Sequence, residues 1–301
     1  MDLSPVLAPR RRRPGPAVAI THRDRVLFPE AGVNKGQVAD YYAAIGRSIL
    51  PWAARRPMSL VRCPPGRERE CFFQKHDTGT FGEHVKSVPI REKDGDTQPY
   101  IFIEGEEGLL ACAQMGTIEF HAWGSRVDDL EKPDRLVFDL DPDEEITFEA
   151  LRDAAFEIRD ELSRMKLVSY PMLTGGKGLH LCVPVRPRAD WPAVKDFATR
   201  FAGAEAIAHP TRFTDLASKA RRRGRLFLDY LRNARGATAI VPFSLRARPG
   251  APVAAPLTWE ELARPEGPIR WHIKDLAELK LRAASKELAD WGTAKQELPD
   301  V

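Results

Sequence analysis

The chain has 301 residues, a net charge of +3, 43% hydrophobic residues and 30% charged residues, which is the composition of a soluble globular protein. This length provides the core of one large domain or two small ones, and the small charge does not by itself indicate a nucleic-acid partner. No run approaches the ~18 apolar residues of a membrane span, and the first residues lack the apolar core of a signal peptide.

The amino-terminal part begins with a polar segment and continues with short apolar elements. Residues 1–16 are rich in Pro and Arg without periodicity and are predicted to be a flexible linker, so the folded domain is expected to cover residues 17–301. Apolar residues at helical spacing predict a helix over 35–53 that ends around Pro51. The next predicted elements are strands at 59–63 and 71–74, loops or a hairpin at 86–100, and a helical segment at 109–120.

The remainder alternates between apolar strands and amphipathic helices. Strands are predicted at 136–141, 167–173, 179–185, 225–230 and 237–244. Helices are predicted at 148–164 and at 190–208, where Asp190 is a suitable N-cap, and residues 257–291 read as terminal helices and loops. This order indicates an α/β or mixed α+β fold.

The four cysteines, at positions 63, 71, 112 and 182, have no paired short spacing. The pattern favours neither a zinc ribbon nor a disulfide framework. We therefore expect four reduced thiols in a cytosolic protein.

Three aspartates on two predicted strands form the most informative pattern. Asp139 and Asp141 are two residues apart and project from the same face of one strand, and Asp229 lies near the end of a second apolar strand. Clustered carboxylates cannot all stay ionised without cations, and hard divalent ions prefer such oxygen ligands. The arrangement is typical of two-metal phosphoryl or nucleotidyl transfer. Alternatively, the Asp-Pro-Asp sequence turns the chain and caps the next helix.

A glycine-rich turn joins the strands at 167–173 and 179–185. Its glycines allow the backbone to approach an anion, and Thr174, Lys177 and His180 supply donors for a nucleoside triphosphate. It is not a Walker loop, because the spacing differs and it joins strand to strand. The alternative is an ordinary hairpin. Arginine runs flank Asp229, and arginines near carboxylates favour phosphate binding over a merely solvated face.

Two neighbouring aromatic residues form a further candidate site. Phe72 and Phe73 point to opposite faces of a predicted strand, so at most one is forced into the core and the other is free to stack on a base. The alternative is that both are core residues. His121 is equally ambiguous, because a lone His near the end of an element is usually structural.

Together, five motifs resemble the polymerase domain of bacterial ATP-dependent DNA ligase D, a family of the archaeo-eukaryotic primase superfamily that works in non-homologous end joining. They lie at 137–142, 174–181, 229–233, 239–250 and 253–262. The resemblance covers roughly residues 20–291 and implies a primase-polymerase fold with mixed and antiparallel sheets around a central cleft.

The resemblance also implies roles for individual residues. Asp139, Asp141 and Asp229 are expected to bind two ions, Mn²⁺ or Mg²⁺, and to catalyse nucleotidyl transfer. The remaining implied contacts are with the triphosphate (Thr174, Lys177, His180, Arg246), with bases (Phe72, Phe73), with the primer (His121) and with a downstream 5′-phosphate (His22, Arg25, Lys35). The family often has Asn at the position of His22 and Lys at that of Arg25, so end recognition departs from its pattern here.

The implied function is a polymerase that adds ribo- or deoxyribonucleotides to a primer 3′-hydroxyl at DNA gaps and double-strand breaks. Ribonucleotides are expected to be accepted and favoured, with Ser244 as a candidate for reading the sugar. Expected partners are nucleoside triphosphates, DNA with a 5′-phosphate end, ligase and nuclease domains of the same polypeptide, and a bacterial Ku-type end-binding protein, in the cytoplasm at the nucleoid. The alternatives are a primase that starts chains without a primer, a non-catalytic end-bridging module, and a metal-dependent nuclease.

Overall fold

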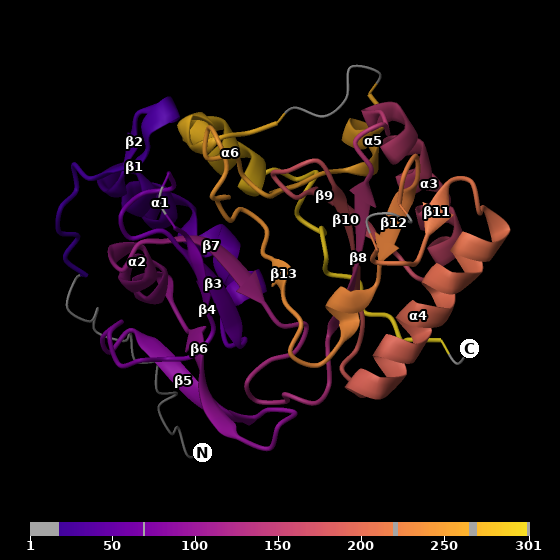
Figure 1. Cartoon of the computed structure of the whole chain (residues 1–301), viewed down its shortest axis with the longest axis horizontal. Coiled ribbons are helices and arrows are strands. Elements are labelled where there is room, and N and C mark those ends of the chain that lie inside the picture. Colours follow the sequence, from indigo (N-terminus) through magenta and orange to yellow (C-terminus); the bar gives the residue numbers. More distant parts are fainter. Residues whose placement is uncertain (1–17, 69, 219–221, 265–269, 300–301) are drawn as a thin grey trace, which may run out of the picture.

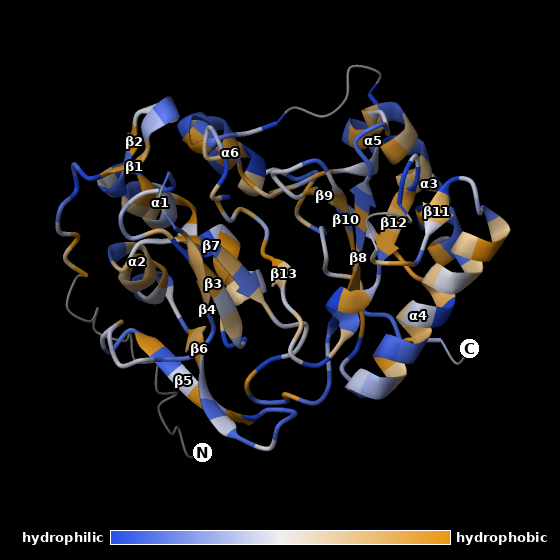
Figure 2. Ribbon diagram, in the orientation of Figure 1, coloured by the Kyte–Doolittle hydropathy of each residue, from blue (hydrophilic) through white to orange (hydrophobic). Residues whose placement is uncertain are grey.

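The computed structural model describes residues 18–68, 70–218, 222–264 and 270–299. The predicted linker at 1–16 lies outside these residues. None of the described helices is both long and apolar enough to cross a membrane. Figure 1 shows two halves side by side, each built on its own β-sheet. Hydrophobic residues line the central strands of both halves, as the hydropathy colouring of Figure 2 shows.

A six-stranded, mainly antiparallel sheet forms the carboxy-terminal half. Its strands, in spatial order, are β11 (Phe213–Thr214), β12 (Leu226–Asp229), β8 (Arg135–Pro142), β10 (Leu179–Pro184), β9 (Tyr170–Leu173) and β14 (Ala255–Pro256). Helices α3 (Phe148–Arg164) and α4 (Trp191–Ala208) pack against it. The ring of Phe138 contacts that of Phe201 on α4, with centroids 4.9 Å apart. Because side chains alternate along β8, the residues on either side of Phe138 face away from α4.

A four-stranded sheet forms the amino-terminal half. Its strands, in spatial order, are β13 (Ala239–Ile240), β7 (Thr117–Ala122), β3 (Met58–Arg62) and β4 (Phe72–Gln74). Helices α1 (Lys35–Ala53) and α2 (Glu106–Gln114) pack together and against β7. Two hairpins flank this half, formed by β1 (Val26–Phe28) with β2 (Val33–Asn34), and by β5 (Val85–Arg91) with β6 (Thr97–Ile103). The edge strand β13 follows β12 in sequence, so the chain returns from one half to the other.

The remaining elements are short. They are the 3₁₀ helices η1 (Pro29–Ala31), η3 (Leu231–Asn233) and η4 (Ile273–Asp275), and the helices α5 (Trp259–Leu262) and α6 (Leu276–Ala283).

Two buried tyrosines of α1 fix the segment that follows β13. The Tyr41 hydroxyl donates to the Phe243 carbonyl at 2.8 Å, and the Tyr42 hydroxyl donates to the Ile118 carbonyl and accepts the Leu245 amide at 3.1 Å. Phe243 has a φ of 64°, a conformation that costs a non-glycine residue free energy and requires such support. These contacts fix the position of the backbone that leads to Arg246.

The predicted elements are largely confirmed, with corrections at segment ends. Helix α1 covers the predicted 35–53 and includes Pro51 in its last turns rather than ending there. The segment predicted as helical at 109–120 is wrong beyond Gln114: Gly116, with a φ of +79°, ends the helical path and β7 follows. Of the strand predicted at 237–244, β13 is formed, and the backbone turns at Phe243.

The prediction of four reduced thiols is wrong for one pair, because Cys63 and Cys71 form a disulfide with their Cα atoms 4.4 Å apart. Cys63 directly follows β3 and Cys71 directly precedes β4, and these strands pair antiparallel. Closing the hairpin therefore brings the two sulfurs together, which spacing along the chain did not reveal. Cys112 and Cys182 remain free and buried.

We expect Cys63→Ser/Cys71→Ser to lower the free energy of unfolding by ~2–3 kcal/mol, because the crosslink restricts the unfolded chain. Urea unfolding of the oxidised protein and the variant measures the difference. Wild-type protein reduced by a dithiol should match the variant. Four titratable thiols in the unreduced, unfolded wild type would contradict the disulfide.

Candidate functional site

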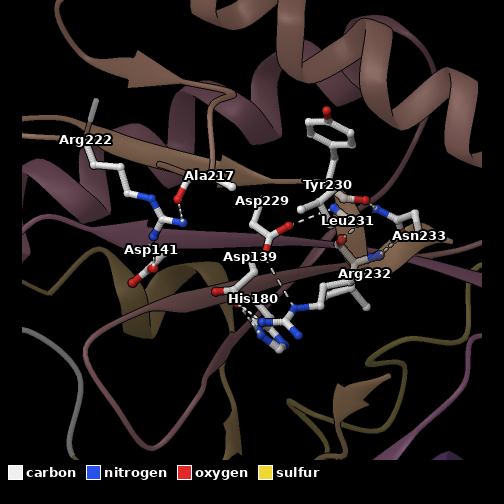
Figure 3. A network of polar contacts seen from close by, with 11 residues as sticks. Asp139, Asp141, His180, Ala217, Arg222, Asp229, Tyr230, Leu231, Arg232 and Asn233 are labelled. Carbon is white, nitrogen blue, oxygen red and sulfur yellow. Dashed lines mark hydrogen bonds and ion pairs between the residues drawn. The ribbon is translucent and has the colours of Figure 1, made fainter. Parts of the chain in front are cut away.

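The register of three neighbouring strands places ionisable side chains in one row. In the six-stranded sheet, Asp139 on β8 lies directly opposite Asp229 on β12 and opposite His180 on β10. Directly opposed residues share a face of the sheet, so all three side chains point to the side away from α4. Asp141 lies on the same face by the period of two. His180 Nε2 is 3.5 Å from Asp139 Oδ2, and the two side chains lie next to each other in Figure 3.

Two arginines neutralise these carboxylates. Arg232 lies 3.5 Å from both Asp139 Oδ2 and Asp229 Oδ2, and Arg222 lies 2.6 Å from Asp141 Oδ2 (Figure 3). Within the described parts of the chain, no three His, Cys, Asp or Glu side chains are arranged to hold a metal ion. The oxygen donors suit a hard divalent cation, but the guanidinium groups now balance their charge.

The opposed carboxylates of Asp139 and Asp229 have pKa values shifted in opposite directions. Burial favours a raised pKa at Asp139, but the charge and hydrogen bond of His180 and the charges of Arg232 and Arg246 lower it overall. Burial raises the pKa of Asp229, and the charge of Asp139 adds to this, against Arg232 and the Leu231 amide. Two carboxylates that share one site behave in this way.

A short turn holds Arg232 beside the aspartates. The Asp229 side chain accepts the Leu231 amide at 2.7 Å. The Asn233 side chain donates to the Val137 carbonyl at 2.8 Å and accepts the Val137 amide at 2.7 Å. The Asn233 side chain thus forms the hydrogen bonds that a neighbouring strand would make with β8 beyond the end of β12. It also anchors η3, which carries Arg232.

Most of the predicted residues line one cavity of about 260 Å³ between the two sheets. Its lining comprises His121, Asp139, Asp141, Thr174, Lys177, Gly178, His180, Arg232, Thr238, Ala239, Ile240, Arg246 and Arg248. Asp229 lies beside Asp139 but outside this lining. A larger cavity of about 760 Å³, bordered by Trp259 and Trp291, contains none of the predicted site residues. We therefore take the smaller one as the reaction cavity.

The glycine-rich turn is packed against the aspartate row. A side chain at Gly178 would place its Cβ 2.7 Å from the Leu140 carbonyl, so this position requires glycine. The Thr174 hydroxyl donates to the Gly178 carbonyl at 3.0 Å and closes the turn. Lys177 extends outward, with its ammonium 3.7 Å from Glu144. His180 is buried, and its Nδ1 has no hydrogen-bond partner among the described residues.

Glu119 connects two of the predicted residues and was not predicted from the sequence. Its Oε2 accepts a hydrogen bond from His121 Nε2 at 2.7 Å and lies 3.1 Å from Arg246 Nε, while its Oε1 accepts the Ala247 amide at 2.7 Å. Burial alone would raise the pKa of Glu119, but His121 and Arg246 lower it to about 2. The alternation of Glu119 and His121 on one strand was the available signal, and it was lost because this segment was predicted as helical.

The two neighbouring phenylalanines are both exposed. Phe72 is 42% and Phe73 71% exposed, so neither belongs to the core. They border a shallow cavity separate from the reaction cavity. The Phe73 ring lies 6.0 Å from that of His121, which lines the reaction cavity. The aromatic surface therefore adjoins the site.

The residues proposed to bind a 5′-phosphate lie close together, but most of their polar groups already have hydrogen-bond partners. The Lys35 amide donates to the Arg25 carbonyl at 2.8 Å, so the segment folds back and brings the two residues together. The Lys35 side chain is buried, and its ammonium bonds the Thr21 carbonyl and Gln114 at 2.9 and 2.8 Å.

The backbone at this end of α1 is occupied as well, because the amides of Lys35, Gly36 and Gln37 all have hydrogen-bond partners. Arg25 donates to the Pro64 carbonyl at 3.1 Å, and His22 is exposed with a φ of 52°.

Ser244 does not reach the cavity. It is fully buried, and its hydroxyl accepts the Phe120 amide and donates to the Leu245 carbonyl, both at 3.0 Å. The candidate for sugar recognition is therefore wrong, because this hydroxyl joins β7 to the Leu245 segment.

Comparisons with known proteins agree on one family. Residues 34–286 match the family model described as "LigD, primase-polymerase domain". The chain is 35% identical over 286 residues to the multifunctional non-homologous end joining protein LigD of Pseudomonas aeruginosa, covering 93% of this chain and 34% of the relative. It is 30% identical to the bifunctional LigD of Bacillus subtilis, covering 82% and 40%. The chain thus spans between a third and two fifths of the length of these relatives.

A solved structure has the same fold. The polymerase domain of Mycobacterium tuberculosis ligase D, in complex with DNA, superimposes with a TM-score of 0.84 at 30% identity. The match covers 92% of this chain and 98% of that one. The mixed fold expected from the sequence is confirmed.

We expect Glu119→Gln to flatten the acid part of the stability curve. The pKa of Glu119 is about 2 when folded, below its ordinary 4.5, so its contribution to stability is complete above pH 4.5 and is lost as the pH falls through 2. Thermal unfolding across this range should show a smaller decrease for the variant, which should also be less stable near neutrality. The exposed Glu83→Gln is the control, and equal slopes for Glu119→Gln and wild type would contradict the ionised network.

Proposed function

The chain belongs to the LigD primase-polymerase domain family, and from that membership we propose that it is a polymerase for the repair of DNA ends. It adds ribo- or deoxyribonucleotides to a primer 3′-hydroxyl at gaps and double-strand breaks. The observation that carries the proposal is the reaction cavity, where carboxylates for cation binding face basic side chains for a triphosphate, beside an exposed aromatic surface.

Asp139, Asp141 and Asp229 would hold two divalent ions, Mg²⁺ or Mn²⁺. The fit rests on their donor chemistry, because three carboxylates from adjacent strands offer hard oxygen ligands on one face. When bound, such ions lower the pKa of a hydroxyl nucleophile and neutralise phosphate charge. For the aspartates to accept them, Arg222 and Arg232 must give up their present ion pairs.

The basic side chains of the cavity would hold the triphosphate. Lys177, His180 and Arg246 surround the space next to the aspartates and can stabilise negative charge on the leaving pyrophosphate. Glu119 orients Arg246 and, through its hydrogen bond, His121. Arg232, released from the aspartates, would remain near the same phosphates. The closed turn at Thr174 keeps Lys177 and His180 on one side of the cavity.

The exposed aromatics would receive the bases. Phe72 and Phe73 present ring area to solvent, and base stacking on such rings contributes ~1–3 kcal/mol per base. His121 lies between Phe73 and the cavity, which suits a contact with the primer end.

The proposed setting of this chain is inferred from its relatives. Because the chain spans between a third and two fifths of their length, we propose that it works with ligase and nuclease domains of one polypeptide. Gapped or broken DNA with a 5′-phosphate, nucleoside triphosphates and a Ku-type end-binding protein are its proposed partners, at the nucleoid in the cytoplasm.

Asp229→Asn should reduce nucleotide addition at least ~100-fold while leaving DNA affinity nearly unchanged, because DNA affinity comes mainly from basic contacts. Asparagine keeps the acceptor for the Leu231 amide and removes the charge. Primer extension on a gapped duplex, with and without Mn²⁺, and DNA binding at fixed salt are the measurements.

Asp196→Asn on the exposed surface of α4 is the matched control for this experiment. An unprimed single-stranded template tests initiation without a primer, which would favour a primase. Substantial extension by Asp229→Asn would remove Asp229 from the reaction.

Recognition of the downstream end should depend on Arg25 directly and on Lys35 through the order of the segment around Thr21. Arg25→Ala and Lys35→Ala should each remove the gain in affinity that a 5′-phosphate gives a gapped duplex, with little effect on simple primer-templates. Binding of phosphorylated and unphosphorylated gaps at matched salt measures this gain. Equal affinity of the wild type for both gaps would exclude the pocket.

A further inference from the structure

A second cavity, of about 240 Å³, lies on the other side of the glycine-rich turn from the reaction cavity. Its lining comprises Leu173, Gly175, Gly176, Lys177, Arg248, Pro249, Pro252, Val253, Arg270, Trp271 and His272. Lys177 and Arg248 also line the reaction cavity, so the two spaces share their basic wall.

The charge of this second cavity differs from that of the first. Lys177, Arg248 and Arg270 border it, and no Asp or Glu of the described residues lines it. The reaction cavity also contains Asp139 and Asp141, whose carboxylates repel a polyphosphate unless their charge stays balanced. The second cavity suits an anion without a metal ion.

Glycines let two arginines approach the turn between the cavities closely. A Cβ at Gly175, where φ is +70°, would lie 2.7 Å from Arg246 Cγ, and one at Gly176 would lie 3.2 Å from Arg248 Cζ. Arg270 donates to the Gly176 carbonyl at 2.8 Å and holds the turn from the second side. Arg246 and Arg248 thus pack on the two glycines and place positive charge next to the turn.

We propose that the second cavity is a site for the leaving pyrophosphate, reached along Lys177 and Arg248 after nucleotide addition. This inference rests on the proposed function for its physiological ligand. Three basic side chains line it and none of its described lining residues is Asp or Glu, so it suits a small polyphosphate anion. Transfer of pyrophosphate to a site without carboxylates would leave the reaction cavity free for the next triphosphate.

Arg270 separates the two sites experimentally, because it lines the second cavity and not the reaction cavity. Calorimetric titration of sodium pyrophosphate into the whole chain, with a chelator and without DNA, should give about fivefold weaker binding for Arg270→Gln than for wild type. Arg223→Gln, at an exposed arginine outside both cavities, should bind as wild type. Equal pyrophosphate affinity of wild type and Arg270→Gln would overturn the proposal.

Product inhibition provides the second measurement. In primer extension, Arg270→Gln should raise the inhibition constant for pyrophosphate about fivefold while the KM for the nucleoside triphosphate changes by less than about twofold. Parallel changes in both constants would place pyrophosphate in the reaction cavity alone and overturn the second site. Absence of extension by wild type would refute the proposed function, whereas the calorimetric comparison would still test the anion site.

Discussion

Placing several ionisable groups in one buried row across a sheet is costly, and much of the surrounding structure follows from that cost. Asp229, Asp139 and His180 are opposed on three neighbouring strands, so their charges must be compensated locally. Arg232 contacts both aspartates, and Asn233 fixes Arg232 by replacing a ladder partner of β8. The same requirement for compensating charge makes the site suitable for cations and, beyond them, for phosphates.

The basic side of the cavity depends on packing in the other half of the molecule. Tyr41 and Tyr42 hold the backbone around Phe243, and Arg246 emerges three residues later against Glu119 on β7. Glu119 therefore links packing in the amino-terminal half to the orientation of the Arg246 guanidinium in the cavity. Glycines complete the arrangement, since only a turn without side chains lets Arg246 and Arg248 approach it.

Local sequence patterns predicted the features that depend on residues close together along the chain. Alternation along β8 placed Asp139 and Asp141 on one face, and helical periodicity gave the bounds of α1 and α4 closely. The pairing of Asp139 with Asp229 and His180 depends on strand order, which no local pattern contains. Glu119, Arg222 and the Cys63–Cys71 bond escaped prediction for the same reason, because each acquires its partner through tertiary pairing. Ser244 and Lys35 show the converse, since both have plausible chemistry but are buried with their polar groups occupied.

Arg246 limits how the molecule can move, because its side chain contacts both halves. It donates to the Thr174 carbonyl in the turn between β9 and β10, and it pairs with Glu119 on β7 of the opposite sheet. A hinge motion that swung the halves apart would have to break one of these contacts. Adjustment to substrates therefore falls to side chains such as Arg222 and Arg232 and to surface turns. The backbone around the cleft is therefore expected to stay rigid while charged side chains move, without a hinge motion of the two halves.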